Sequence, residues 1–235
     1  MRYQLYYWTG IQGRGEFVRL ALEDAGADYV DVAREDGDDA IMPFLQRERP
    51  GALPFAPPFL KSGRTVIAQT SAILLYLAPR LKLVPAEETA RLYAHQLQLT
   101  IADMVAEVHD THHPIASGLY YKDQRAAAKK RAEDFRQHRL PKFLSYFEDV
   151  LVRGGGRALS KHSYVDLSLF QLVSGLDYAF PHAMRRMHRK LPHLRALAGQ
   201  IAERPRIAAY LASPRRLAFN EDGIFRRYRE LDAAR

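Results

Sequence analysis

The residues best suited to bind a ligand lie near positions 58 and 69. Pro57 and Pro58 open a predicted strand. Gln69 precedes two hydroxyl residues, Thr70 and Ser71, at the expected start of a helix, where such residues are typical N-caps. A helix start offers free N–H groups and a positive dipole end, both of which favour a carboxylate. A proline has no N–H to pair, and a cis proline leaves a neighbouring backbone free to face a ligand. The pattern predicts a pocket for a short, extended, acidic molecule such as a peptide.

These residues need a strand, a turn, a second strand and a helix to hold them in place. The segment that begins at Pro57 is predicted to contain all four. The strand opened by the two prolines is followed by a turn at 61–64, a return strand at 65–67 and an apolar helix from 72. Upstream, strand and helix patterns alternate over residues 2–8, 13–25, 28–33 and 40–46. This order predicts a small α/β domain with a mixed sheet over residues 1–82.

The rest of the chain has helical periodicity. Residues 83–85 form the predicted linker, and residues 86–235 form an all-helical domain. Helices are expected over 86–113, 123–152, from Ser163 onward, 191–203 and 205–211, with a glycine break at 154–156. Ser163 and Asp166 have the spacing of a capping box, which predicts the first turn of the central helix.

The two-domain plan and the Pro58/Gln69 pattern together resemble the cytosolic glutathione transferases, over nearly the whole chain. Pro58 matches the cis-proline of that family, Gln69 matches its Gln at the family spacing, and Thr70 replaces the usual Ser. Ala56 stands where the family often has a Gln, and Leu53-Pro54 is a competing cis-proline. The resemblance implies a thioredoxin-like domain followed by an all-helical domain that carries the second-substrate site. It points to a bacterial, tyrosine-type member, similar to the sigma, mu, alpha and pi classes.

The resemblance also implies which residues contact glutathione. Arg14 lies in a Gly-Arg-x-Glu opening, where it orients the catalytic hydroxyl or forms a structural ion pair with Glu16 or with the partners of Arg19. Asp103 matches the acidic residue that reaches the γ-glutamyl amine of the partner subunit, which implies a homodimer. The expected glutathione-binding set is Tyr7, Arg14, Pro57, Pro58, Gln69, Thr70 and Asp103.

In this family the thiol of glutathione must become a thiolate, and a hydroxyl at the end of the first strand donates a hydrogen bond to it. Tyr7 is the expected catalytic residue, because it follows Leu5 by two positions and shares its face of the strand. Five residues separate Tyr7 from Gly13, one more than the tyrosine-type classes have. Tyr6 and Thr9 therefore remain alternatives.

The implied activity is a transferase in which the thiolate attacks a hydrophobic electrophile, as in detoxification. Glutathione is then a co-substrate, and no cofactor is expected. The alternative is a non-catalytic protein of the same fold that binds glutathione or another ligand. Neither nucleic acid nor membrane is an expected partner, since no nucleic-acid motif and no membrane-spanning apolar run occurs, and cytoplasmic residence fits.

Composition excludes some kinds of site and shows where the charge lies. The 235-residue chain has no cysteine, which excludes disulfides, cysteine-ligated zinc and a cysteine nucleophile. Its net charge of +8 equals the excess of 13 Lys and Arg over 5 Asp and Glu between residues 183 and 235. We interpret this basic end as a solvated helical face that attracts an anionic substrate.

Three histidines at positions 109, 112 and 113 raise the question of a metal, because residues four apart share one helix face. With no cysteine and no required carboxylate pair nearby, the sequence prediction contains no metal site. We expect these histidines to flank the second-substrate site, with Tyr120, Tyr121 and Phe219 as further apolar candidates.

Overall fold

The computed structural model describes residues 2–48 and 51–233. Its N-terminal part contains one mixed sheet in the order β2-β1-β3-β4. β1 pairs in parallel with β2 and antiparallel with β3, which in turn pairs antiparallel with β4. The strands are β1 (Tyr3–Tyr6), β2 (Tyr29–Asp31), β3 (Phe59–Ser62) and β4 (Thr65–Ala68).

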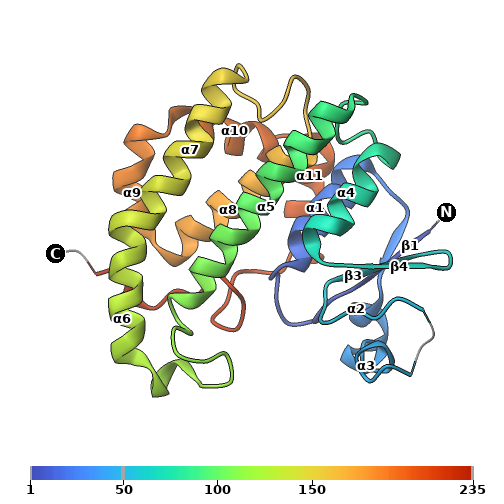
Figure 1. Ribbon diagram of the computed structural model, residues 1–235, viewed down its shortest axis with the longest axis horizontal. Helices are drawn as coiled ribbons and strands as arrows, with labels where there is room; N and C mark the ends of the chain where they lie inside the picture. Colours follow the sequence, from blue (N-terminus) through green and yellow to red (C-terminus); the bar gives the residue numbers. More distant parts are fainter. Residues whose placement is uncertain (1, 49–50, 234–235) are drawn as a thin grey trace.

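Helices cover both faces of this sheet, as Figure 1 shows. The alternation along β1 explains why, because successive side chains point to opposite faces. Leu5 packs with apolar residues of α1 and α4, whereas Tyr6 packs on the other face with residues of the α2–α3 region. The helices are α1 (Gly15–Ala25), α2 (Val32–Asp36), α3 (Met42–Leu45) and α4 (Thr70–Arg80), with a 3-10 turn at Asp38–Ala40.

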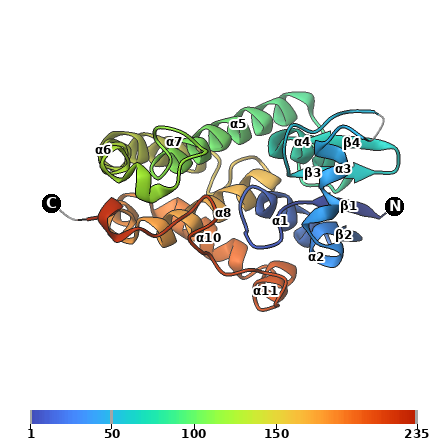
Figure 2. The ribbon, with the colours of Figure 1, turned by 90° about the horizontal axis from the view of Figure 1, so that it is seen from below.

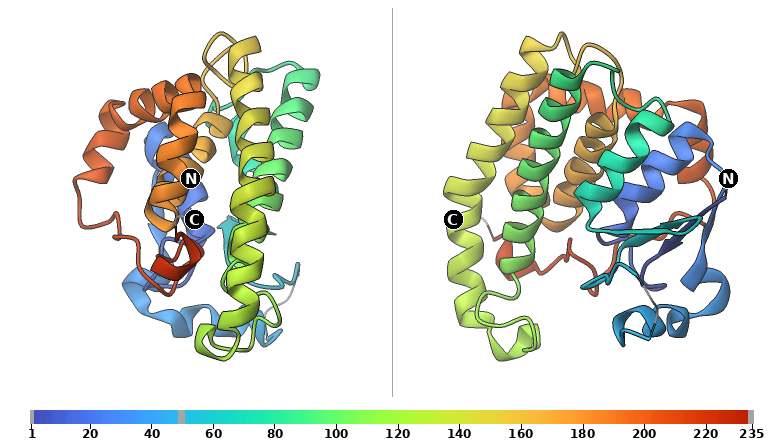
Figure 3. Two further views of the ribbon diagram at one scale, coloured as in Figure 1. Left: turned by 90° about the vertical axis from the view of Figure 1, so that its left-hand side faces the viewer. Right: turned by 45° about the vertical axis from the view of Figure 1, so that its right-hand side comes forward.

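The remainder is helical and lies beside the sheet domain (Figures 1 and 3). Its helices are α5 (Glu88–Asp110), α6 (Arg125–Asp134), α7 (Leu140–Arg153), α8 (Tyr164–Ala179), α9 (Pro181–Met187), α10 (Pro192–Ala202) and α11 (Pro205–Leu211). Short 3-10 turns lie at Tyr121–Asp123, His188–Lys190 and Arg229–Leu231. This architecture confirms the predicted fold class of a thioredoxin-like domain followed by a helical one.

Three details differ from the sequence prediction. The single helix expected over 123–152 is divided into α6 and α7 by a π-helical segment, Phe135–Arg139. α9 was not predicted, and neither was the packed segment that follows α11.

The expected capping box is confirmed, because the Ser163 amide donates to the Asp166 carboxylate at 2.7 Å.

The hydrophobic core continues across the boundary between the two parts. α1 packs on α8 and α4 packs on α5, and one continuous set of buried apolar side chains includes Phe17 and Leu74 from the first part and Leu97 and Leu172 from the second. The two parts therefore present a shared interface on which a site can be held.

The basic C-terminal end binds the N-terminal part instead of forming only a solvated face, which corrects the interpretation of its charge. Arg215 pairs with Glu23, and Arg216 pairs with Glu16 at 2.5 Å. Tyr210 donates a hydrogen bond to the same Glu16 carboxylate at 2.6 Å. Figure 2 shows α11 lying beneath α1, where these contacts form. Arg215, Arg216 and Tyr210 thus hold the C-terminal segment on the carboxylates of α1.

A second contact of the same kind involves Asp24 at the end of α1. Arg204 donates two hydrogen bonds to its carboxylate, and His162 contacts it at 2.9 Å. Burial alone would raise the pKa of Asp24, but these hydrogen bonds and charges hold it below its ordinary value of 3.8. Asp24 therefore stays charged between the domains.

No helix among residues 2–48 and 51–233 is long and apolar enough to cross a lipid bilayer.

Candidate active site

Tyr7 lies just beyond the end of β1, under the start of α1, and is 4% exposed. The backbone N–H of Arg14 donates to its hydroxyl oxygen at 2.8 Å. This bond uses an acceptor position of the hydroxyl and leaves its proton for donation to another group. Burial raises the pKa of Tyr7 above its ordinary value, although the Arg14 amide and the charges of Arg14 and Arg19 oppose this. The hydroxyl is therefore protonated at neutral pH and suited to act as a donor.

The two alternatives to Tyr7 lie elsewhere. Tyr6 is on the opposite face of the sheet, where its ring stacks on Phe59 at 4.6 Å and tilts against Phe44 at 5.1 Å. Thr9 lies in the loop after β1, and its amide donates to the Asp38 carboxylate at 3.0 Å. Of the three candidates, only Tyr7 is bonded to the opening of α1.

Two glycines allow the tyrosine to lie this close to the backbone of the loop. A Cβ at Gly13, whose φ is +48°, would come within 2.0 Å of the Tyr7 hydroxyl oxygen. A Cβ at Gly15 would come within 2.5 Å of the Tyr7 ring. The sequence analysis missed this role, although the Gly-Arg-Gly spacing after an aromatic strand is a signal for close backbone approach.

The loop that carries the extra residue is held by the helical domain. Gln12 is 5% exposed and accepts a hydrogen bond from Gln171 of α8 at 2.9 Å. Its own amide group donates to the Leu217 carbonyl. The Gly10 carbonyl accepts from Asn220 at 2.8 Å. Sequence reasoning could not identify Gln12, because its partners lie more than 150 positions away.

The proline and helix-start residues have the expected geometry. The Pro57–Pro58 peptide bond is cis, and Leu53–Pro54 is not among the cis bonds of the described residues. Gln69 is exposed and has φ +69° and ψ 121°, an uncommon backbone conformation for this residue type. Positive φ turns the backbone at the point where α4 begins.

The expected N-cap is wrong in its detail. The cap position of α4 is Gln69, no side chain bonds to the free amides there, and Thr70 is the first residue of the helix. The Thr70 hydroxyl donates instead to the Arg14 carbonyl at 3.4 Å. The first-turn amides of α4 are thus left without a side-chain cap, and the Arg14 backbone links the helix start to the tyrosine.

Arg14 and Asp103 differ in how the structure places them. Arg14 and Thr70 line a small cavity of about 30 Å³ together with Phe17 and residues of α5. The alternative of an ion pair with Glu16 is wrong, because the Glu16 carboxylate binds Arg19 and Arg216 instead. Asp103 lies on the exposed side of α5 and does not meet the other predicted residues within one chain.

The aromatic residues expected near the histidines do not form one pocket with them. Tyr121 stacks on Tyr228 at 3.8 Å, Phe219 stacks on Tyr178 at 5.1 Å, and Tyr120 is 74% exposed. The histidines themselves form a compact group at the end of α5.

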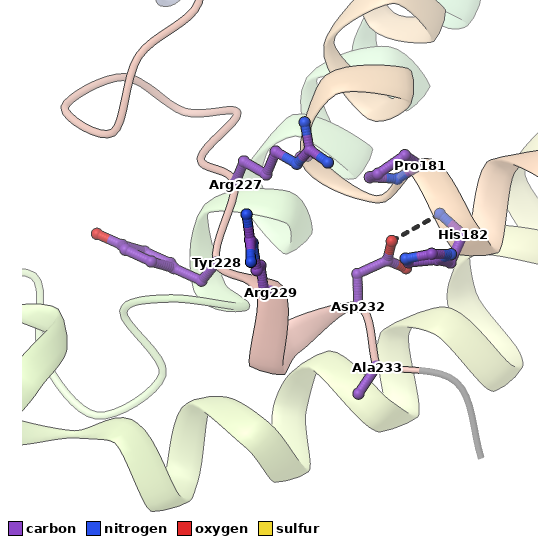
Figure 4. Close-up of a pocket in the computed structure, with 8 residues that line it drawn as sticks. Pro181, His182, Arg227, Tyr228, Arg229, Asp232 and Ala233 are labelled. Atoms are coloured by element: carbon purple, nitrogen blue, oxygen red, sulfur yellow. Dashed lines mark hydrogen bonds between the residues drawn. The ribbon is translucent and has the colours of Figure 1, made fainter.

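A larger cavity of about 290 Å³ lies beside the C-terminal segment (Figure 4). Arg227, Tyr228 and Arg229 line one side of it, and His182 follows the start of α9 on the other. Asp232 accepts a hydrogen bond from the His182 amide at 2.7 Å and so joins the chain end to that helix. None of the predicted site residues lines this cavity.

The fold and the arrangement around Tyr7 define a protein of the glutathione S-transferase fold. Residues 109–214 match the family model described as "Glutathione S-transferase, C-terminal domain". The chain is 24% identical over 218 residues to a glutathione S-transferase of Plasmodium falciparum, which covers 89% of this chain and 94% of that protein. It is 27% identical over 212 residues to glutathione S-transferase P 10 of Caenorhabditis elegans, over 88% and 90% of the two chains.

Solved structures agree on the fold. A pi-class glutathione S-transferase of Onchocerca volvulus has a TM-score of 0.68 at 24% identity, over 89% of this chain and 92% of that one. Prostaglandin synthase D of Nilaparvata lugens has a TM-score of 0.69 at 20% identity, over 91% and 98%. The chain is therefore similar in sequence to glutathione S-transferases over most of its length and has their fold. The expectation of a bacterial member finds no support, since these relatives come from a protozoan, nematodes and an insect.

Proposed function

We propose that this protein is a glutathione transferase in which Tyr7 donates a hydrogen bond to the thiolate of bound glutathione. The observation that carries the proposal is the bond from the Arg14 amide to the Tyr7 hydroxyl, because it orients the hydroxyl and leaves its proton to donate. A protonated donor stabilises a developing anion, and it does so most strongly where water is excluded.

The backbone of glutathione would lie along the features beside it. Pro57 and Pro58 bring the start of β3 to this place, and Gln69 and Thr70 present the uncapped amides of α4 to a carboxylate. The thiolate would then attack a small hydrophobic electrophile, which enters from the side of α5. Cytoplasmic detoxification is the corresponding role.

A homodimer fits the exposed side of α5. Leu92 and Leu99 are 62% and 48% exposed, and Asp103 follows them at helical spacing on the same side. Phe55, in the loop before β3, is 92% exposed. Exposed apolar side chains grouped in this way mark contact surfaces. In a symmetric dimer Asp103 would reach the glutathione amine bound to the partner.

One observation favours the alternative of a non-catalytic binding protein. Tyr7 is 4% exposed, and the cavity beside Arg14 and Thr70 is about 30 Å³. A thiol reaches the hydroxyl only if the side chains around this cavity move apart. Binding without turnover would identify this alternative.

The test compares Tyr7→Phe with the wild type in calorimetric glutathione binding and in conjugation of a chloro-dinitrobenzene. A hydrogen bond to a charged group contributes about 1.5–3 kcal/mol, so we expect roughly a 10–150-fold loss of rate. The pKa of bound glutathione, followed by thiolate absorbance, should rise in the variant. Tyr3→Phe, which removes a tyrosine hydroxyl from β1, the strand that leads to Tyr7, is the matched control. An unchanged rate and an unchanged pKa of the bound thiol would show that Tyr7 has only a packing role and does not stabilise the thiolate.

Thr70→Val tests the binding site separately. It removes the hydroxyl beside the first amides of α4 while keeping the shape of the side chain. We expect clearly weaker glutathione binding, because the link from Thr70 to the Arg14 carbonyl is lost. An unchanged affinity would indicate that glutathione binds elsewhere on the protein.

A further inference from the structure

The end of α5 carries three histidines, and one ring nitrogen from each lies within 4.8 Å of the other two. His109 is in the last turn of the helix, and His112 and His113 lie in the turn that follows. The rings of His109 and His113 stack with centroids 4.8 Å apart, and the Nδ1 atoms of His112 and His113 are 2.5 Å apart. Each ring therefore directs a nitrogen toward a shared space.

The hydrogen bonding of His112 determines which of its nitrogens is available. Its Nε2 lies 2.8 Å from the carbonyl oxygen of Ile224, and a carbonyl only accepts, so Nε2 carries the proton. Nδ1 of the neutral ring then carries the lone pair. It accepts a hydrogen bond from Nδ1–H of His113 at 2.5 Å, and it would bind a metal ion once that proton is released. A ring N–H bonded to a backbone carbonyl is the usual outer-shell arrangement of a metal-binding histidine.

Charged groups of both signs face the cluster. Arg14 and Arg226 are the cations, and the Arg226 guanidinium donates to the Gly223 carbonyl at 2.7 Å, which partly engages its charge. Asp110 is the anion, with a carboxylate oxygen 3.9 Å from Nδ1 of His109. A bound dication would be repelled by the arginines and attracted by Asp110, so we expect an affinity set mainly by the three imidazoles.

We propose that His109, His112 and His113 form a binding site for a transition-metal dication such as Zn²⁺, with a fourth coordination position open. Three imidazoles and an open position are a common zinc environment, with Zn–N distances of about 2.0–2.1 Å. Ligands at that distance in a tetrahedron are about 3.4 Å apart. Small ring rotations would bring the three nitrogens to this spacing. They would lengthen the 2.5 Å distance between Nδ1 of His112 and Nδ1 of His113, and shorten the largest distance, 4.8 Å.

The site is accessible from outside and lies about one helical turn from the cavity beside Arg14 and Thr70. The His109 side chain is 25% exposed, so an ion has a path to the rings. Val105, one helical turn before His109, lines the cavity shared with Arg14 and Thr70. The proposal does not depend on glutathione binding.

The experiment uses the full-length protein without an affinity tag and without glutathione, stripped of metal by a chelator. Zn²⁺ is titrated by calorimetry, and Co²⁺ is followed by its visible absorption, which reports the coordination geometry. We expect saturation at one ion per chain. His109→Gln and His113→Gln should each weaken binding by at least about tenfold. His138→Gln, on an exposed side chain outside the cluster, should leave it unchanged.

Circular dichroism checks that each variant is folded. If His109→Gln fails to fold, His113→Gln decides the outcome, because His113 is only half-buried. The proposal is overturned if Zn²⁺ gives no saturable binding, or if both cluster variants bind it with wild-type stoichiometry and affinity. Weakening of equal size in His138→Gln would also overturn it.

Discussion

Replacement of Glu16 by alanine should destabilise the whole protein, because this one carboxylate joins the first helix to the C-terminal segment. Glu16 is completely buried. Its oxygens accept hydrogen bonds from Arg19 at 3.2 Å, Arg216 at 2.5 Å and Tyr210 at 2.6 Å. Glu16→Ala leaves both guanidinium groups and the phenol without this acceptor.

The size of the effect follows from the burial. Breaking a buried ion pair by removing one partner typically costs about 3–5 kcal/mol, since the other charge stays buried. Domains of this kind are stable by about 5–15 kcal/mol, so the loss is a large fraction of the total. Glu16→Gln keeps an acceptor oxygen and loses only the charge, so we expect a smaller loss of about 1.5–3 kcal/mol.

Urea denaturation followed by circular dichroism measures both variants against the wild type. Glu35→Ala, on an exposed helix position, is the control and should stay within about 0.5 kcal/mol of the wild type. A loss below about 1 kcal/mol in Glu16→Ala would refute the reasoning, since a buried cation left without its partner costs more than that.

Three further outcomes are expected. Gly15→Ala should reduce glutathione conjugation strongly in a folded protein, because its Cβ would press within 2.5 Å of the Tyr7 ring; wild-type kinetics would contradict the packing. Asp24 has a lowered pKa in the folded state, so its stabilising contribution is present above pH 3.8 and is lost as the pH falls through the folded value. Acid titration of the unfolding free energy should therefore be shallower in Asp24→Asn, and an identical slope would argue against this linkage. Sedimentation should show a dimer at micromolar concentration that Leu99→Asp weakens, whereas a wild-type monomer would count against both the dimer and the role of Asp103.

Much of the local structure was predictable, because local patterns determine it. The period-2 alternation of β1, the turn between β3 and β4 and the Ser163–Asp166 box each depend on residues a few positions apart. The Pro58 and Gln69 pattern had the family spacing, and the structure has a cis bond and a positive φ at these places. The choice of Tyr7 over Tyr6 rested on the same alternation, since the two face opposite sides of the sheet.

Other features depend on partners that only the folded chain brings together. Thr70 was expected to cap α4, but the position of the Arg14 carbonyl determines where its hydroxyl points. The basic end was interpreted as solvated, and Arg185, Arg186 and Arg189 are indeed exposed. Arg215 and Arg216 instead bind carboxylates of α1 from more than 180 positions away.

By itself, the sequence determined the order of strands and helices, the two-part plan and the residues from which a site is built, because periodicity, caps and turns act over a few residues. Tertiary structure alone decided which of them meet. It anchored the longer loop on α8 through Gln12 and joined Glu16 of α1 to Tyr210 and Arg216. Such contacts form where elements far apart in the chain pack on each other, and no local pattern records their distances.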